Sequence, residues 1–348
     1  MRNIKLSYYP YTLKLKHPFT IATNSRTTTP IVLVEIEYDG LTGYGEASLP
    51  PYLPETQMSV QEFLSSIDLS RYNDITDIES ILADIDKSIP GNNAAKASVD
   101  IALHDLKGKI LGVSVYKMLG LPKKGMFTSY TIGIDSNEMI LNKLKEADKF
   151  KILKVKLGSK NDRDIIETIR RITNKPIYAD INQGWSNRYE AIDMCFWLQT
   201  KNVVLIEQPF KKNNIEDNEW LNQRSPIPII ADEAVQRLED IDRIKNIYSG
   251  INIKLMKCTG LNEALKMINY ARELNLSVMI GCMTETSCAI SAAAQISSLA
   301  DWADLDGNIL ITNDSFEGVS GIDGMIIPNG NPGIGIRKIT NLSLPKLV

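Results

Sequence analysis

Residues 151–157 read Lys-Ile-Leu-Lys-Val-Lys-Leu, residues 176–181 read Pro-Ile-Tyr-Ala-Asp-Ile, and residues 203–207 read Val-Val-Leu-Ile-Glu. Each run is short, rich in aliphatic residues and interrupted by charge near its end, as expected of a buried strand in a parallel sheet. Helical spacing at 162–172 and 187–200 separates these runs. The alternation of strand and helix favours an α/β fold built on a parallel sheet.

Further runs of the same kind bring the number of candidate strands to eight. They occupy 127–134, 227–231, 250–255, 277–281 and 301–305. Eight such repeats favour closure into a barrel over an open sheet. We therefore predict a (β/α)7β TIM-type barrel over residues 126–315.

The chain before the barrel has a different pattern. Residues 31–38 alternate between polar and apolar, Asp39-Gly40 is a hairpin turn signal, and 41–47 return as a second strand. Residues 92–111 then follow helical spacing and stop before Gly112. We predict an α+β domain over residues 1–125, and residues 316–348, rich in Gly, Asn and Pro, are expected to return to it as a C-terminal segment.

Composition narrows the range of functions. Lys and Arg number 39 against 42 Asp and Glu, a net charge of -3, so a nucleic-acid partner is not expected. No apolar run approaches the roughly 18 to 20 residues that span a bilayer, and four cysteines without a Cys-x-x-Cys pair suit a reducing compartment. We expect a cytoplasmic protein with no membrane partner. His17 and His104 are the only histidines, which excludes a His-rich zinc site.

Charged residues stand at the ends of successive candidate strands, at intervals of 22 to 27 residues from Lys156 to Lys254. They are Lys154, Lys156, Asp180, Glu207, Asp232, Lys254, Asp304 and Asp306. An interval of one strand and one helix brings each side chain to the same height around a barrel, at the C-terminal mouth where active sites lie. The sequence therefore predicts one shared site.

Three carboxylates in that site, Asp180, Glu207 and Asp232, would repel one another without a cation, and an all-oxygen set selects Mg²⁺ over zinc. Lys156 precedes them and Lys254 follows them, so a substrate bound at the centre would have a lysine on each face. A lysine near other cations can have its pKa lowered toward roughly 7 to 8 and act as a base. One lysine removes a proton and the other returns it, which predicts an epimerisation.

The ordered set of Lys-Val-Lys, Asp, Glu, Asp and Lys resembles the enolase superfamily, in which a Lys or His base works beside Mg²⁺, and specifically its muconate lactonizing enzyme subgroup. The resemblance extends from the N-terminal domain, a capping domain in that family, to the last strand. Asp304-Leu305-Asp306 looks like the Asp-x-Asp motif with which dipeptide epimerases hold the α-ammonium group of a dipeptide.

The resemblance implies a role for each matching residue. It implies that Asp180, Glu207 and Asp232 bind Mg²⁺, that Lys156 and Lys254 are the two acid/bases, that Lys154 assists at the substrate carboxylate, that Thr131 and Met283 contact the substrate, and that Asp304 and Asp306 hold its ammonium group. A substrate-specificity loop is expected at about 17–30. It contains Arg26, which suits a bidentate grip on a glutamyl carboxylate.

We therefore expect a Mg²⁺-dependent isomerase, a dipeptide epimerase that acts on L-Ala-D/L-Glu in the recycling of cell-wall peptides. An epimerase of hydrophobic or aromatic dipeptides, and an o-succinylbenzoate synthase or cycloisomerase of the same fold, are alternatives. A non-catalytic binding protein is a third, although binding alone needs no lysine on each face. The expected partner is a small-molecule dipeptide, and the sequence leaves assembly into a homo-oligomer open.

Overall fold

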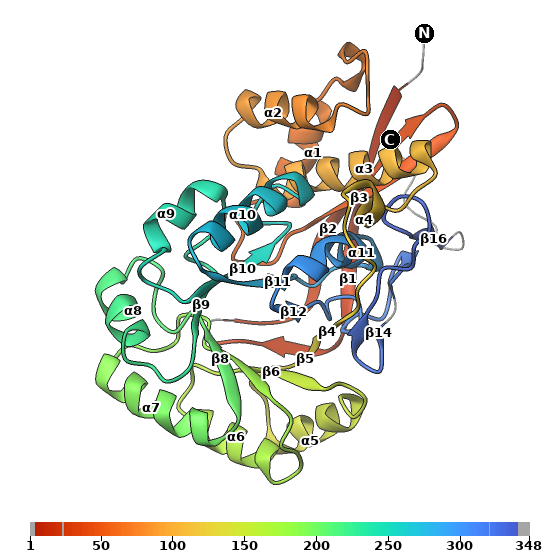
Figure 1. Cartoon of the computed structure of the whole chain (residues 1–348). Helices are drawn as coiled ribbons and strands as arrows, with labels where there is room; N and C mark the ends of the chain where they lie inside the picture. Colours follow the sequence, from red (N-terminus) through yellow and green to blue (C-terminus); the bar gives the residue numbers. More distant parts are fainter. Residues whose placement is uncertain (1–3, 23, 320, 340–348) are drawn as a thin grey trace.

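The computed structural model describes residues 4–22, 24–319 and 321–339. Its central sheet has eight parallel strands in the order β12-β11-β10-β9-β8-β7-β6-β5, and a bridge between Thr128 and Ala303 links the two edges, so the sheet curves into a barrel (Figure 1). The strands are β5 (Ser129–Ile132), β6 (Ile152–Lys156), β7 (Ile177–Asp180), β8 (Val203–Glu207), β9 (Ile229–Ala231), β10 (Gly250–Lys254), β11 (Ser277–Gly281) and β12 (Trp302–Asp304). Each lies within or against a predicted strand, and the predicted barrel fold is confirmed.

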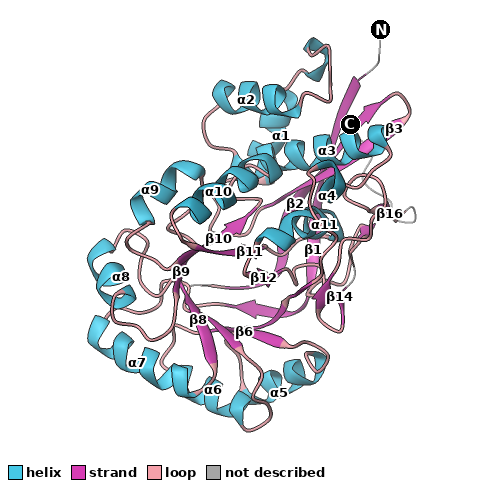
Figure 2. Ribbon diagram, viewed as in Figure 1, coloured by secondary structure: helices cyan, strands magenta, loops and turns pink. Residues whose placement is uncertain are grey.

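Helices follow the first seven strands and cover the outside of the barrel (Figure 2). They are α5 (Asn137–Glu146), α6 (Asp162–Arg170), α7 (Arg188–Thr200), α8 (Ile215–Asn222), η2 (Leu238–Asp240) with α9 (Ile241–Ile244), α10 (Leu261–Glu273), and α11 (Ser287–Ile296) with η3 (Ser297–Leu299). Of the helices described, none combines the length and the apolar character that crossing a bilayer demands.

An apolar layer fills the barrel below its C-terminal mouth. Tyr178, Leu205 and Ile230 form one buried cluster with Met279. Each of the first three stands two residues before Asp180, Glu207 or Asp232, so it projects to the same face of its strand one level lower. The predicted site residues therefore lie directly above a buried apolar layer.

The N-terminal domain is an antiparallel sheet, β1-β2-β3, covered by helices. Gly43 and Gly45 in β3 let α3 approach closely, because a Cβ on either glycine would collide with a carbonyl oxygen of that helix. Gly112 ends α3 in a left-handed conformation, as its sequence position predicts. The elements are β1 (Ile4–Thr20), β2 (Ser25–Tyr38), β3 (Leu41–Ser48), α1 (Gln57–Ser65), η1 (Leu69–Arg71), α2 (Ile78–Ser88), α3 (Asn93–Leu111) and α4 (Val115–Met118).

The segment predicted as a specificity loop at about 17–30 is mostly strand. β1 and β2 continue into it, and Phe19 pairs with Arg26 near the tip of the hairpin. The β-branched run 27–29 favours this extended conformation, which the polar character of the segment concealed. The turn is correspondingly short, and residue 23 within it lies outside the described residues.

The chain after the barrel forms two small sheets. β13 (Phe316–Glu317) pairs with β16 (Arg337–Lys338), and β14 (Gly321–Ile322), β15 (Met325–Ile326) and β4 (Met126–Phe127) form the other. An ion pair between Lys338 and Glu35 of β2 supports the proposal that this segment returns to the N-terminal domain. Residues 320 and 340–348 of the proposed segment lie outside the described residues, and the boundaries at 125 and 315 remain proposals.

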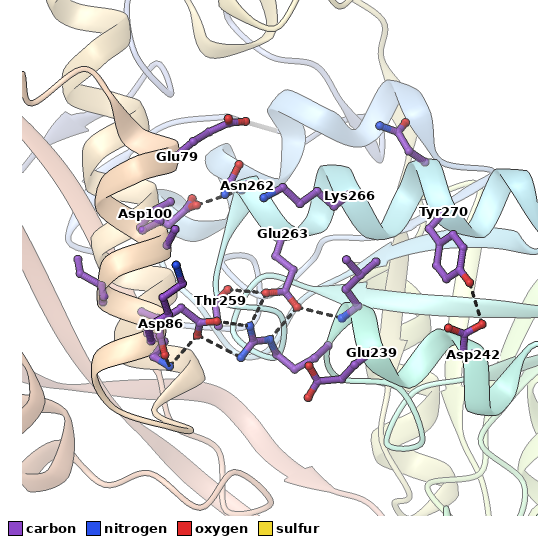
Figure 3. Close-up of a pocket in the computed structure, with 18 of the residues that line it drawn as sticks. Glu79, Asp86, Asp100, Glu239, Asp242, Thr259, Asn262, Glu263, Lys266 and Tyr270 are labelled. Carbon is purple, nitrogen blue, oxygen red and sulfur yellow. Dashed lines mark hydrogen bonds and ion pairs between the residues drawn. The ribbon is translucent and has the colours of Figure 1, made fainter.

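A cavity of about 780 Å³ lies between the N-terminal domain and the barrel, beside α2, α3 and α10 (Figure 3). Its central charged groups form ion pairs: Arg237, after β9, binds Asp86 of α2 at 2.9 Å and Glu263 of α10 at 2.7 Å. Lys96 of α3 also binds Asp86, at 2.7 Å. The pair between Arg237 and Asp86 joins the barrel to the N-terminal domain, and the other two pairs, each within one domain, hold these side chains in place.

Replacing Arg237 with Ala should therefore lower the free energy of unfolding by about 2 to 3 kcal/mol, because two carboxylates lose charge-assisted hydrogen bonds. Urea unfolding measures the change. Arg337→Ala, which removes the exposed pair with Glu317, is the control and should cost under about 1 kcal/mol. Equal effects of the two substitutions would contradict the assigned role of Arg237.

Candidate active site

The register of the barrel strands brings the predicted site residues to one level. Lys156 pairs with Asp180 between β6 and β7, and Asp180 pairs with Glu207 between β7 and β8. On the other side of the barrel, Gly281 pairs with Lys254 and with Asp304. Since paired residues of adjacent parallel strands lie side by side, these side chains share the C-terminal mouth.

Asp180, Glu207 and Asp232 form a compact carboxylate cluster. Each is at most 2% exposed, and their ligand oxygens lie within 4.8 Å of one another. Burial and the charge of Asp180 raise the pKa of Glu207 to about 7, and a bound cation would favour its ionised form. An all-oxygen cluster of this kind fits Mg²⁺.

Lys154 lies among the carboxylates of two proposed subsites. Its Nζ atom is 2.7 Å from Glu207, 3.1 Å from Asp180 and 2.7 Å from Asp304. Burial lowers its pKa, but attraction to these carboxylates prevails and holds the pKa well above the usual lysine value. Lys154 is therefore a fixed positive charge between the proposed metal cluster and the Asp304 subsite.

Lys156 and Lys254 come from β6 and β10, the second and sixth of eight strands, and so approach from opposite sides of the barrel. Lys156 Nζ is 2.5 Å from Asp180, and Lys254 Nζ is 2.7 Å from Asp232. Each lysine thus contacts one carboxylate of the cluster from its own side.

Charged neighbours decide the pKa of Lys254. Burial lowers this pKa, but among the protein's own groups the attraction of Asp232 and Glu207 is stronger and raises it well above the usual value. The lowered pKa expected from the sequence depends on neighbouring cations such as Mg²⁺, and it stays a prediction.

Lys257, three residues after Lys254, competes with it on sequence alone. It lies in the turn after β10, is 1% exposed, and donates to Asp232 Oδ1 at 2.5 Å, to the Asp232 carbonyl at 2.8 Å and to the Asn252 carbonyl at 2.9 Å. Its donors are thus directed to protein oxygens, while Lys254 lines the cavity. This geometry supports Lys254 as the residue that faces a substrate.

Asp304 and Asp306 also line the cavity. Asp304 Oδ1 accepts a hydrogen bond from Ser129 Oγ at 2.6 Å, and Asp306 Oδ2 accepts one from the Thr131 amide at 2.6 Å. Burial and the charge of Asp304 raise the pKa of Asp306 to about 7. No lysine or arginine of the described ranges forms an ion pair with Asp306, so this carboxylate suits a cationic group from a ligand.

Arg26 also lines this cavity. Its Nη2 donates to Thr284 Oγ1 at 3.2 Å, its Nε donates to Thr29 Oγ1 at 3.2 Å, and the guanidinium carbon stacks 4.9 Å from the centre of the Phe19 ring. Burial lowers the pKa of Arg26. Within the described part of the chain it pairs with no carboxylate, so its guanidinium is available to an anion.

Sequence reasoning missed several groups around the cavity. Tyr52 donates its hydroxyl to the Met283 sulfur at 2.6 Å, and Asn252 donates to Glu207 Oε1 at 2.8 Å. Asn252 stands two residues before Lys254 on β10, a spacing that predicts a shared face. Tyr52 follows two prolines in an irregular stretch, and no periodic signal indicates where its ring lies.

Both histidines lie outside the site, as expected. His17 bonds to Glu146 at 2.7 Å, and the buried His104 bonds to the Asp100 carbonyl at 3.0 Å. The cavity between the lysines is small, about 60 Å³, compared with the one at the domain boundary. We assign the chemistry to the smaller cavity because Asp232 of the carboxylate cluster, Lys156, Lys254 and Arg26 all line it.

The comparisons with known proteins agree with this geometry. The family model described as Enolase C-terminal domain-like matches residues 140–338, and the model of the Mandelate racemase / muconate lactonizing enzyme N-terminal domain matches residues 4–120. An L-Ala-D/L-Glu epimerase of Bacteroides thetaiotaomicron is 55% identical over 338 residues, which cover 97% of this chain and 88% of the relative.

Solved structures of two other proteins have the same fold. The N-succinyl Arg/Lys racemase of Bacillus cereus superimposes with a TM-score of 0.90 at 28% identity, over 97% of this chain and 95% of that one. A dipeptide epimerase of Enterococcus faecalis, complexed with Mg and the dipeptide L-Leu-L-Tyr, has a TM-score of 0.89 at 31% identity, over 97% and 99%.

Binding of Mg²⁺ to the carboxylate cluster should stabilise the fold, by about 3 kcal/mol at a hundredfold excess over the dissociation constant. Thermal unfolding with and without MgCl₂ measures the effect. Asp180→Asn and Glu207→Gln should abolish the shift, while Glu138→Gln on the exposed face of α5 should keep it. A full shift in both cluster variants would contradict the metal assignment.

Proposed function

Because the chain belongs to the mandelate racemase / muconate lactonizing enzyme family of the enolase superfamily, we propose that it is a Mg²⁺-dependent dipeptide epimerase acting on L-Ala-D/L-Glu. The observation that carries this proposal is the pair of lysines on opposite sides of the carboxylate cluster, Lys156 on β6 and Lys254 on β10. Two opposed acid/bases permit a proton to leave one face of a carbon and return to the other.

In the proposed reaction the α-carbon of the C-terminal residue of the dipeptide lies between the two lysines. For one epimer Lys156, in its neutral form, takes the α-proton, and the ammonium group of Lys254 supplies a proton from the other face; for the other epimer the roles reverse. Mg²⁺, when bound by Asp180, Glu207 and Asp232, stabilises the negative charge that develops on the substrate carboxylate. Both lysines must therefore be present in either direction.

The remaining residues hold the substrate in place. Lys154, a permanent cation, assists at the substrate carboxylate, while Asp304 and Asp306 bind the α-ammonium group of the N-terminal residue. Thr131 and Met283 contact the dipeptide in the cavity. The high pKa of Asp306 supports this arrangement, because a substrate ammonium beside it would stabilise its ionised form.

Arg26 is the residue that we propose selects a glutamyl side chain. Its guanidinium is held by two hydroxyl groups and the Phe19 ring and has no carboxylate partner within the described ranges. A half-buried cation of this kind favours an acidic substrate side chain over an apolar one. The 55% identical relative, named for an L-Ala-D/L-Glu substrate, supports the same choice.

Other activities of this fold remain the alternatives. Hydrophobic or aromatic dipeptides leave Arg26 without a counter-charge. An N-succinylamino acid, or the substrate of an o-succinylbenzoate synthase or cycloisomerase, has no α-ammonium group to offer Asp304 and Asp306, which would repel its carboxylates. A protein that only binds dipeptides has no need of lysines on both faces.

We further propose that the enzyme works in the cytoplasm on cell-wall peptides, that neither nucleic acid nor membrane is a partner, and that any assembly is a homo-oligomer. The four cysteines support a reducing compartment, since all are free thiols. Cell fractionation and sedimentation of the purified chain test these points.

The mechanism predicts incorporation of one deuterium at the α-carbon of the C-terminal residue when L-Ala-L-Glu epimerises in deuterated water. Lys156→Ala and Lys254→Ala should each lower turnover at least about 10³-fold, because each removes an obligatory proton carrier, whereas Lys145→Ala on α5 should not. Mass spectrometry and polarimetry measure exchange and epimerisation. If deuterium exchange occurred at the α-carbon of N-succinyl-L-glutamate but on no dipeptide, the result would favour a racemase of N-succinylamino acids over a dipeptide epimerase.

Arg26→Met should lower kcat/KM for L-Ala-L-Glu by about 10- to 100-fold, the effect of losing a charge-assisted hydrogen bond to the substrate. The value for L-Ala-L-Leu should change less than about threefold, since no such bond is lost. Arg163→Met on the outer helix α6, where Arg163 stacks on Trp197, is the matched control. Equal losses on both dipeptides would rule out side-chain selection by Arg26.

A further inference from the structure

The end of strand β3 contacts the barrel loop that follows β11. Glu46 and Ser48 belong to β3 of the N-terminal domain, and both are fully buried. Opposite them lie residues 284–286, between β11 and α11. Met283 and Thr284, at the start of this loop, line the proposed substrate cavity.

Two side chains make this contact. The Glu46 carboxylate accepts hydrogen bonds from the backbone amide of Thr286, at 3.0 Å and 3.2 Å, and from its hydroxyl. The Ser48 hydroxyl donates to the carbonyl of Thr284 at 2.7 Å. Glu46 and Ser48 thus bind the loop on both sides of residue 285 and fix its position relative to β3.

The position of this loop affects the orientation of Arg26, because Thr284 supplies one of the two hydroxyl groups that bind its guanidinium. Arg26 stands on β2 and Thr284 on the barrel, so their distance depends on how the two domains are registered. β3 is paired with β2 along its length. Glu46 and Ser48 therefore tie Thr284 to the sheet that also carries Arg26.

Capping of α11 alone does not account for Glu46. Thr286 already caps this helix through its own hydroxyl, which accepts from the Cys288 amide at 3.1 Å. Asp314 accepts from the amide and the hydroxyl of Ser287 at the same end. Burial raises the pKa of Glu46 to about 7, so its ionised form is held at a cost in free energy. A carboxylate from another domain at a helix end that has two caps indicates a second role.

We propose that Glu46 and Ser48 are positioning residues for substrate selection: they hold the loop 284–286 where Thr284 directs Arg26 toward the side-chain carboxylate of the dipeptide. The inference rests on the proposed function. It assigns them no part in proton transfer, because neither lines the cavity.

The test measures selectivity, the ratio of kcat/KM for L-Ala-L-Glu to that for L-Ala-L-Leu. Glu46→Gln and Ser48→Ala should each lower this ratio about tenfold, mainly through a higher KM for L-Ala-L-Glu, since a misplaced Arg26 loses most of one hydrogen bond. Exchange of the α-proton of L-Ala-L-Leu in deuterated water should stay within about twofold. Asp314→Asn, which weakens a cap of α11 and removes a residue that forms no hydrogen bond with Glu46 or Thr284, should lower Tm and leave the ratio unchanged.

A double-mutant cycle separates positioning from general damage. If Glu46 and Ser48 act through Arg26, neither substitution should change the ratio further in an Arg26→Met background. An unchanged ratio in Ser48→Ala and in folded Glu46→Gln, or an equal fall in Asp314→Asn, would overturn the inference while the proposed function stands. A wild-type protein that epimerises no dipeptide, or an Arg26→Met variant with the wild-type ratio, would overturn the proposed function and the inference together.

Discussion

The repulsion among three buried carboxylates is the constraint around which the barrel mouth is organised. Asp180, Glu207 and Asp232 are buried above an apolar layer, where solvent screens their mutual repulsion poorly. Cations must therefore lie close to them. Four lysines of the protein, Lys154, Lys156, Lys254 and Lys257, lie between 2.5 and 3.1 Å from these carboxylates. In the proposed reaction two of these lysines, Lys156 and Lys254, are also the acid/base groups, and Lys154 provides positive charge at the substrate carboxylate.

The N-terminal domain completes the site that the barrel begins. The barrel contributes the charges that suit the reacting carboxylate and ammonium ends of a dipeptide, whereas the β1–β2 hairpin brings Phe19 and Arg26 over the cavity. In the proposed function, the barrel therefore carries out the proton transfer and the N-terminal domain selects the substrate side chain. Their cooperation depends on the few contacts that fix one domain against the other, such as the pairs made by Arg237 and by Glu46.

The sequence predicts the barrel and the residues around its mouth because both follow from local periodicity. One strand and one helix recur at a nearly constant interval, and each charged residue ends an aliphatic run. The contacts between domains have no such signal. Thr286 lies 240 residues from Glu46, and neither the burial of Lys257 nor the extension of β1 to Thr20 changes the local pattern. The identity of a side chain predicts its chemistry, while its distant partner depends on how the folded layers meet.

Because Lys156 and Lys254 lie on opposite sides of the barrel, each turnover would leave the proposed enzyme with a different one of the two lysines protonated. Each conversion protonates one lysine and deprotonates the other. The free protein that remains after product release therefore has the protonation state that suits the other epimer of the substrate. Before the protein can convert the first epimer again, the two lysines must exchange protons with solvent. At high substrate concentration that resetting step, which involves no substrate at all, sets an upper limit to the rate in one direction.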